Sequence, residues 1–224
     1  MKKLISLLLT AAMLTSFALT GCGSGSTETT TAEGGQTTEE TTQEETSSDD
    51  KKVFVYPADQ DVSNLLPSSG GSDSVAVMYK PLYDPLYIIN NAETRYYLVD
   101  KLEVSDDGLN IKLHFNENAK WHDGEPVTVD DLLFTLKYFT EGATKTSTTY
   151  TKINGEDVVY EKVDDYNVNI TLPFYLSKFV TTLGRLCIYP EHVFNGDVTT
   201  VETSDAAMQG IGNGPFKLKE WNKV

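Results

Sequence analysis

The stretch from Gly23 to Lys52 limits how much of this 224-residue chain can fold. It contains nine threonines and eight acidic side chains, but its one apolar side chain is Ala32. Such a segment cannot bury enough surface to offset the entropy that ordering would cost. We therefore predict a solvated, disordered linker over residues 22–52 and a folded part over residues 53–224.

An export signal precedes the linker. Lys2 and Lys3 are followed by an apolar run from Leu4 to Leu19, and the sequence Leu-Thr-Gly-Cys ends at Cys22. A basic start, a short apolar region and small residues before a cleavage point are typical of a secretory signal. A transmembrane anchor is the weaker alternative, because threonines and a serine interrupt a run that is already short for a bilayer.

The residues ending at Cys22 also match the lipobox of bacterial lipoproteins. This predicts that residues 1–21 are removed and that the Cys22 thiol carries lipid, which would hold the protein at the outer side of the cell membrane. Cys187 is then left without a pairing partner. It lies in an apolar context with only Arg185 as a basic neighbour, so we expect a small buried hydrophobe rather than a nucleophile.

The charge of the folded part narrows the possible partners. The whole chain has a formal net charge of −15, and residues 53–224 hold 14 basic and 25 acidic side chains, which gives −11. Such an acidic surface argues against nucleic acid or anionic lipid headgroups as partners. It suits a ligand that is neutral or cationic.

The hydrophobic pattern predicts a mixed α/β fold. A helix should begin at Ser72 or Asp73 and stop near Pro81. A hairpin should turn at Asp107-Gly108, because apolar residues alternate along its second strand. The remaining extended segments that we expect are short strands at residues 52–57, 156–163, 166–174 and 217–221.

The segment from Lys120 to Leu136 allows two interpretations. His122 beside Asp123 could be a base with its orienting acid, but no serine or cysteine nucleophile is near in sequence, and the three histidines lack zinc-site spacing. Alternatively, Trp121 anchors a loop that turns at Asp123-Gly124, and Thr128 with Asp131 forms a capping-box-like helix start. One face of that helix should then hold the apolar residues Val129, Leu132, Leu133, Leu136 and Phe139. We favour the structural corner, and we predict no catalytic residue, metal ligand or cofactor.

Several segments together resemble a known family. "YKPLYDPLY", the hairpin followed by "KWHDGEPVTVDDLLFTL", "IYPEHVF" and "GNGPFKLKEW" occur in the order seen in family 5 extracellular solute-binding proteins, the peptide/nickel-type receptors of ABC importers. The resemblance implies a periplasmic-binding-protein-like fold of two lobes that close on a ligand. It also implies that this chain is an N-terminal fragment holding an incomplete lobe I, with an inserted subdomain at about 73–176.

The resemblance also indicates a ligand-binding loop. In peptide-binding relatives the loop after the first strand offers its backbone to an extended ligand, and glycines permit such a close approach. The corresponding candidates here are Ser69, Gly70, Gly71 and Ser72. A mobile surface turn before the helix is the alternative. The glycines of "GIGNGPF" lead into an expected strand, so we interpret them as a turn rather than a phosphate cradle.

The function implied by the resemblance is solute capture. The protein would be a monomeric, non-enzymatic substrate-binding component that binds peptides or another small solute outside the cell and delivers them to ABC permease subunits. Nickel complexes or oligosaccharides are alternative ligands within the family. The alternatives from other classes are an exported surface hydrolase or metalloenzyme, and a passive surface lipoprotein.

Overall fold

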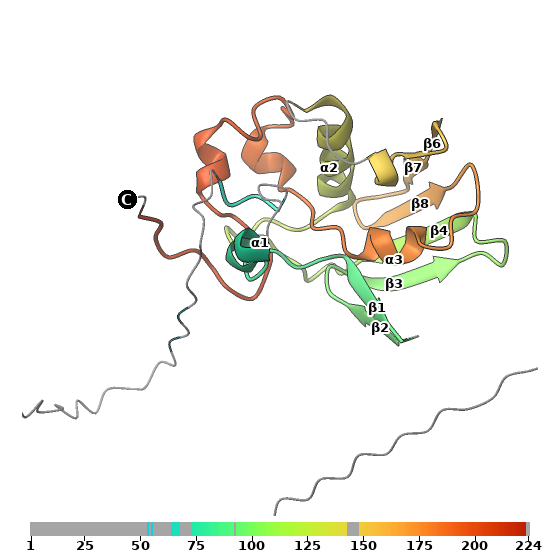
Figure 1. The fold of residues 1–224 in the computed structure, drawn as a ribbon, viewed down its shortest axis with the longest axis horizontal. Helices are drawn as coiled ribbons and strands as arrows, with labels where there is room; N and C mark the ends of the chain where they lie inside the picture. Colours follow the sequence, from blue (N-terminus) through green and yellow to red (C-terminus); the bar gives the residue numbers. More distant parts are fainter. Residues whose placement is uncertain are drawn as a thin grey trace, which may run out of the picture. The chain divides into compact units, whose positions relative to one another are not determined.

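The computed structural model describes residues 53, 55, 64–67, 73–91, 93–142 and 148–222. From residue 64 on, the described residues belong to one compact unit. Its helices are α1 (Asp73–Tyr79), α2 (Val129–Glu141) and α3 (Phe179–Gly184), with short 3-10 helices η1 (Thr148–Tyr150), η2 (Glu191–Phe194) and η3 (Asp205–Met208). Its strands are β1 (Tyr87–Asn90), β2 (Glu93–Tyr96), β3 (Val99–Val104), β4 (Asn110–Phe115), β5 (Lys152–Ile153), β6 (Glu156–Asp157), β7 (Val159–Lys162) and β8 (Asn167–Thr171) (Figure 1). The predicted mixed α/β fold and the helix α1 are confirmed. None of the described helices is long and apolar enough to span a membrane.

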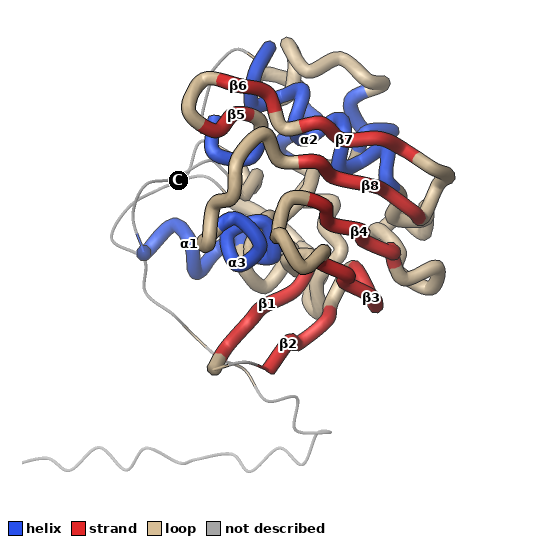
Figure 2. The backbone as a smooth tube through the Cα atoms, turned by 90° about the vertical axis from the view of Figure 1, so that its right-hand side faces the viewer, coloured by secondary structure: helices blue, strands red, loops and turns tan. Residues whose placement is uncertain are grey.

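An antiparallel sheet in the order β3-β4-β8-β7 forms the framework of this unit (Figure 2). The predicted hairpin is confirmed, because β3 pairs with β4 and the chain turns at Asp107 and Gly108. Gly108 has a φ of 69°, and a Cβ there would lie 2.7 Å from the Tyr175 ring, so this turn requires glycine. The other two strands, β7 and β8, lie within the runs expected at residues 156–163 and 166–174 and are shorter than predicted.

One face of the sheet is buried and the other faces solvent. On β4 the alternate residues Ile111, Leu113 and Phe115 are at most 1% exposed, whereas Asn110 and Lys112 between them are exposed. This alternation follows from the two-residue period of a strand. The apolar face therefore supplies the core against which α2 packs.

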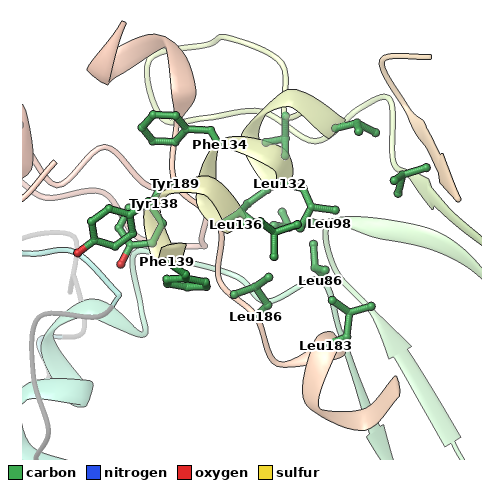
Figure 3. Packing of buried hydrophobic residues seen from close by; sticks show 14 of the residues in the cluster. Leu86, Leu98, Leu132, Phe134, Leu136, Tyr138, Phe139, Leu183, Leu186 and Tyr189 are labelled. Carbon is green, nitrogen blue, oxygen red and sulfur yellow. The ribbon is translucent and has the colours of Figure 1, made fainter. Parts of the chain in front are cut away.

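Helix α2 is buried more widely than its sequence pattern predicts. Val129, Leu132, Leu136 and Phe139 lie in the core as expected, and Leu133 is partly buried. A second side of the helix is also covered, because Phe134 stacks on Phe194 of η2 with ring centroids 5.8 Å apart. Figure 3 shows how the labelled apolar side chains gather around α2.

A buried carboxylate joins three segments at the start of α2. Asp131 accepts hydrogen bonds from the Trp121 indole N–H at 3.1 Å, from the Thr128 backbone N–H at 2.9 Å and from the Glu191 backbone N–H at 2.9 Å. Burial raises the pKa of Asp131, and these hydrogen bonds oppose part of that rise. Asp131 therefore fixes the 121 corner, the helix start and η2 together.

One predicted strand is not observed, and another lies mostly outside the described residues. Val53 and Val55 are the described residues of the expected first strand, and neither belongs to a strand. The expected strand at Lys217–Trp221 is wrong, because those residues have no strand pairing. The segment just before it is held instead by a loop, through Gly214 N–H to Leu82 O at 2.8 Å and Phe216 N–H to Pro81 O at 3.1 Å. A strand needs a neighbouring ladder, and the described residues supply none beside residues 217–221.

We predict that Asp131→Ala lowers the free energy of unfolding by about 2–5 kcal/mol, because one buried and two partly buried N–H donors lose their acceptor. Urea denaturation followed by circular dichroism would measure the change. Asp130→Ala is the matched control in the same helical turn: its carboxylate is 53% exposed and pairs with Lys162, so the expected loss is at most about 1 kcal/mol. Equal losses in the two variants would show that Asp131 has no special structural role.

Candidate functional site

His122 has a structural position in the folded unit. Its Nδ1 accepts the backbone N–H of Gly212 at 3.1 Å, and its Nε2 lies 2.9 Å from the Gly214 carbonyl, to which it donates in the matching tautomer. Its backbone N–H donates to Gly212 O at 2.7 Å. Because both ring nitrogens are engaged by backbone groups, the interpretation of this stretch as a structural corner is supported.

Asp123 pairs with His192 and not with the adjacent His122. Its Oδ2 lies 2.9 Å from Nε2 of His192 in η2. Partial burial would raise the pKa of Asp123, but the hydrogen bonds from His192 and from the Glu125 N–H hold it below its ordinary value. The pair of base and orienting acid that residues 122 and 123 could have formed is therefore not present. Among the described residues, no three His, Cys, Asp or Glu side chains are grouped so that they could hold a metal ion.

Cys187 is a protonated, weakly reactive thiol. Burial raises its pKa to about 12, Asp84 adds to the rise and Lys80 opposes it. The thiolate is the nucleophilic form of cysteine, so a thiol that stays protonated at neutral pH is inert. The structure agrees with the expectation of a small hydrophobe here, although the side chain is only partly buried and reaches the two hollows described next.

The first hollow, which we call the tyrosine hollow, has a volume of about 170 Å³, and half of its lining residues are aromatic. Its lining residues are Pro67, Tyr79, Phe139, Tyr150, Arg185, Leu186, Cys187 and Tyr189. Phe139 organises the wall, since its ring stacks on Tyr150 at 5.7 Å and meets Tyr189 edge-on at 6.5 Å. Burial raises the pKa of both Tyr79 and Tyr150, so their hydroxyls remain neutral donors at neutral pH.

The second hollow, which we call the charged hollow, is larger, at about 540 Å³. Its lining residues are Lys80, Tyr83, Asp84, Pro85, Ile88, Asn90, Tyr97, Arg185 and Cys187. Arg185 and Cys187 line both hollows, so a single segment of chain separates them.

Backbone hydrogen bonds bring the distant walls of these hollows together. Leu86 N–H donates to Leu186 O at 3.1 Å, which places the 185–187 segment beside the loop that carries Asp84. The same segment is fastened to α2, because Tyr189 N–H donates to the buried Thr135 hydroxyl at 2.8 Å. That hydroxyl in turn donates to Asp131 O at 2.7 Å.

The described residues that line the two hollows differ from the four ligand-binding residues that the sequence predicted. Ser69, Gly70, Gly71 and Ser72 lie outside the described residues, as does the lipidation candidate Cys22. Pro67, two positions before Ser69, does line the tyrosine hollow. Sequence reasoning did not identify Tyr150 or Arg185 as site residues. The available signal was Arg185, a cation two positions before Cys187 in an otherwise apolar stretch.

Known proteins similar to this chain bind peptides or serve ABC transporters. The oligopeptide-binding protein AppA of Bacillus subtilis is 28% identical over 182 residues, which cover 70% of this chain and 33% of that protein. The crystal structure of the ABC transporter substrate-binding protein CtaP of Listeria monocytogenes is 27% identical, with a TM-score of 0.65, and the match covers 72% of this chain and 33% of CtaP. The structure of Bacillus subtilis AppA in complex with a nonapeptide is 25% identical, with a TM-score of 0.58, and the match covers 74% of this chain and 33% of AppA.

The chain thus spans about a third of the length of these relatives. Residues 93–224, more than half of the chain, match the family model described as bacterial extracellular solute-binding proteins, family 5 middle. The mixed α/β architecture and the periplasmic-binding-protein fold class agree with that match. The chain therefore belongs to family 5 of the bacterial extracellular solute-binding proteins.

Proposed function

We propose that this chain is part of the substrate-binding component of an ABC importer, which captures peptides or a related small solute outside the cell and delivers them to the membrane permease. The observation that carries this proposal is the family match over residues 93–224, together with peptide-binding relatives such as AppA. The inert thiol of Cys187 and the engaged ring of His122 are consistent with a binding role rather than a catalytic one.

The tyrosine hollow is our candidate for one wall of the peptide site. Aromatic side chains with neutral hydroxyls offer large contact areas and hydrogen-bond donors to a peptide. We propose that Ser69, Gly70, Gly71 and Ser72 add backbone contacts at this wall, because Pro67 of the hollow precedes them closely in the chain. We further propose that residues 73–176 form the subdomain inserted in lobe I, and that the protein acts as a monomer.

We predict that short peptides raise the melting temperature of the complete protein by several degrees. A ligand present at 100 times its Kd stabilises the folded state by about 2.7 kcal/mol. Differential scanning fluorimetry with peptide mixtures would measure the shift, with oligosaccharides and nickel–histidine mixtures as comparison ligands. A shift with the comparison ligands alone would contradict the assignment of peptides as the solute.

We also expect Tyr150→Ala to weaken peptide binding about tenfold, since stacking and burial at an aromatic anchor are lost. Isothermal titration calorimetry would give the Kd. Tyr96→Ala is the matched control, because Tyr96 lies on β2, is 42% exposed and does not line either hollow. Equal weakening in both variants would remove the tyrosine hollow from the binding site.

The lipobox carries a separate proposal about location. We propose that the signal is cleaved before Cys22 and that lipid on Cys22 holds the folded unit at the outer side of the cell membrane, with residues 22–52 as a spacer. A linker rich in threonine and glutamate stays solvated and extended, which would let the folded unit reach solutes away from the bilayer.

We predict that Cys22→Ser blocks processing of the precursor or releases the protein from the membrane. Detergent phase partitioning and immunoblotting of cell fractions would show the change, and Cys187→Ser would be the control, expected to leave partitioning unaltered. A Cys22→Ser protein of mature size that still enters the detergent phase would overturn the lipid anchor.

A further inference from the structure

The charged hollow has a local charge opposite to that of the chain. Its walls hold two cations, Lys80 and Arg185, and one carboxylate, Asp84, whereas the whole chain has a formal net charge of −15. Burial raises the pKa of Asp84, and the nearby His122 opposes part of that rise. The hollow is therefore a positive spot on an acidic protein.

The two cations of the hollow are free to take a ligand. Within the described part of the chain, neither Lys80 nor Arg185 forms an ion pair. Several other lysines are paired, including Lys101 with Glu103, Lys152 with Asp157 and Lys162 with Asp130. The backbone of Arg185 is fixed at the end of α3, where its N–H donates to Thr182 O at 3.1 Å.

The three charged residues line one hollow together with Cys187. The pKa of the Cys187 thiol responds both to Asp84, which raises it, and to Lys80, which lowers it. Cys187 is two residues from Arg185, and all four residues line the same hollow. Asp84 is held in place by its backbone N–H, which donates to Asn213 Oδ1 at 2.9 Å. The cations and the carboxylate are therefore close enough to act on one small ligand.

The remaining walls suit a small organic solute rather than an inorganic ion alone. Tyr83 is buried, and Pro85 and Ile88 add apolar surface. A volume of about 540 Å³ lies within the range of roughly 300–1,000 Å³ that is usual for small-molecule sites, which are mostly apolar with a few convergent polar groups.

We propose that the charged hollow binds a carboxylate of the captured solute, with Arg185 as the main anchor and Lys80 as the second cation. A guanidinium fork matches the two oxygens of a carboxylate, which makes such pairs strong and directional. Asp84 faces the same solute and favours an ammonium or N–H group beside its carboxylate. The inference rests on the proposed function in taking the solute to be a peptide or related molecule, and it adds that the solute is recognised as an acid.

The test measures binding to the complete protein by isothermal titration calorimetry. It compares pairs of ligands in which one carboxylate is replaced by a neutral amide group. Trialanine and trialanine amide test a C-terminal carboxylate, Ala-Glu-Ala amide and Ala-Gln-Ala amide test an acidic side chain, and N-acetylalanine and its amide test a solute that is not a peptide. We expect at least one acid to bind about 10- to 100-fold more tightly than its amide, because hydrogen bonds to charged groups are the stronger ones. Added salt should reduce the difference.

Arg185→Met should remove this preference while amide binding stays within about twofold, since the variant keeps the length of the side chain and loses the fork. Lys178→Met is the matched control, because Lys178 is an exposed cation next to α3 that does not line the charged hollow, and it should keep the preference. Circular dichroism melting of both variants would show whether they fold as the parent does. If Arg185→Met fails to fold, Arg185→Lys and Lys80→Met replace it, and each should lower the preference partially.

The outcomes separate the two proposals. Peptides that bind with equal affinity as acid and amide overturn the carboxylate site and leave the proposed function standing. An Arg185-dependent preference for N-acetylalanine without any peptide binding overturns peptide capture and supports the carboxylate site. A preference that survives Arg185→Met and Lys80→Met overturns the assignment to this hollow, and a wild-type protein that binds none of the six ligands overturns both proposals.

Discussion

The Asp131 carboxylate is the contact on which the arrangement of this unit depends. It accepts one side-chain and two backbone N–H groups from segments that lie 10 residues before it, 3 residues before it and 60 residues after it. A buried carboxylate is costly unless such donors surround it, so the three segments must meet correctly for the unit to be stable. One helical turn later, Thr135 fastens Tyr189 to the same helix. The segment that carries Arg185 and Cys187, which line both hollows, is thus fastened to the buried side of α2.

Local sequence signals predicted the elements whose partners are near in the chain. The β3–β4 hairpin needed only alternating apolar residues and a glycine with positive φ, and the start of α2 needed only Thr128 and Asp131. The strand expected at Lys217–Trp221 failed because alternation cannot supply a pairing partner. The second buried side of α2 was missed for a related reason, since Phe134 is covered by Phe194, 60 residues away.

In the candidate site, too, local sequence features could be predicted, whereas contacts between distant residues could not. The corner formed by Trp121 and His122 could be predicted as structural, because a turn, a helix cap and the absence of nearby nucleophiles are all local features. The partners that settle it, Gly212 and Gly214 for the ring of His122, are about 90 residues away. The hollows could not be predicted, because only folding brings their walls together. The tyrosine hollow combines α1, α2, η1 and the 185–189 segment, and the charged hollow combines residues 80–97 with Arg185 and Cys187.

The net negative charge of the chain and the cations of the charged hollow act on a solute over different distances. A net charge of −11 on residues 53–224 predicted neutral or cationic ligands, and that argument applies to the approach of a solute from solution. At physiological ionic strength charges are screened beyond roughly 8 Å, so a bound group responds chiefly to the side chains that it touches. The nearest charges inside the charged hollow are those of Arg185, Lys80 and Asp84, and an acidic exterior disfavours polyanions while a small zwitterion, with no net charge, can still enter. An overall charge therefore excludes classes of large partners, whereas the choice of a small solute is made by the few groups that line its site.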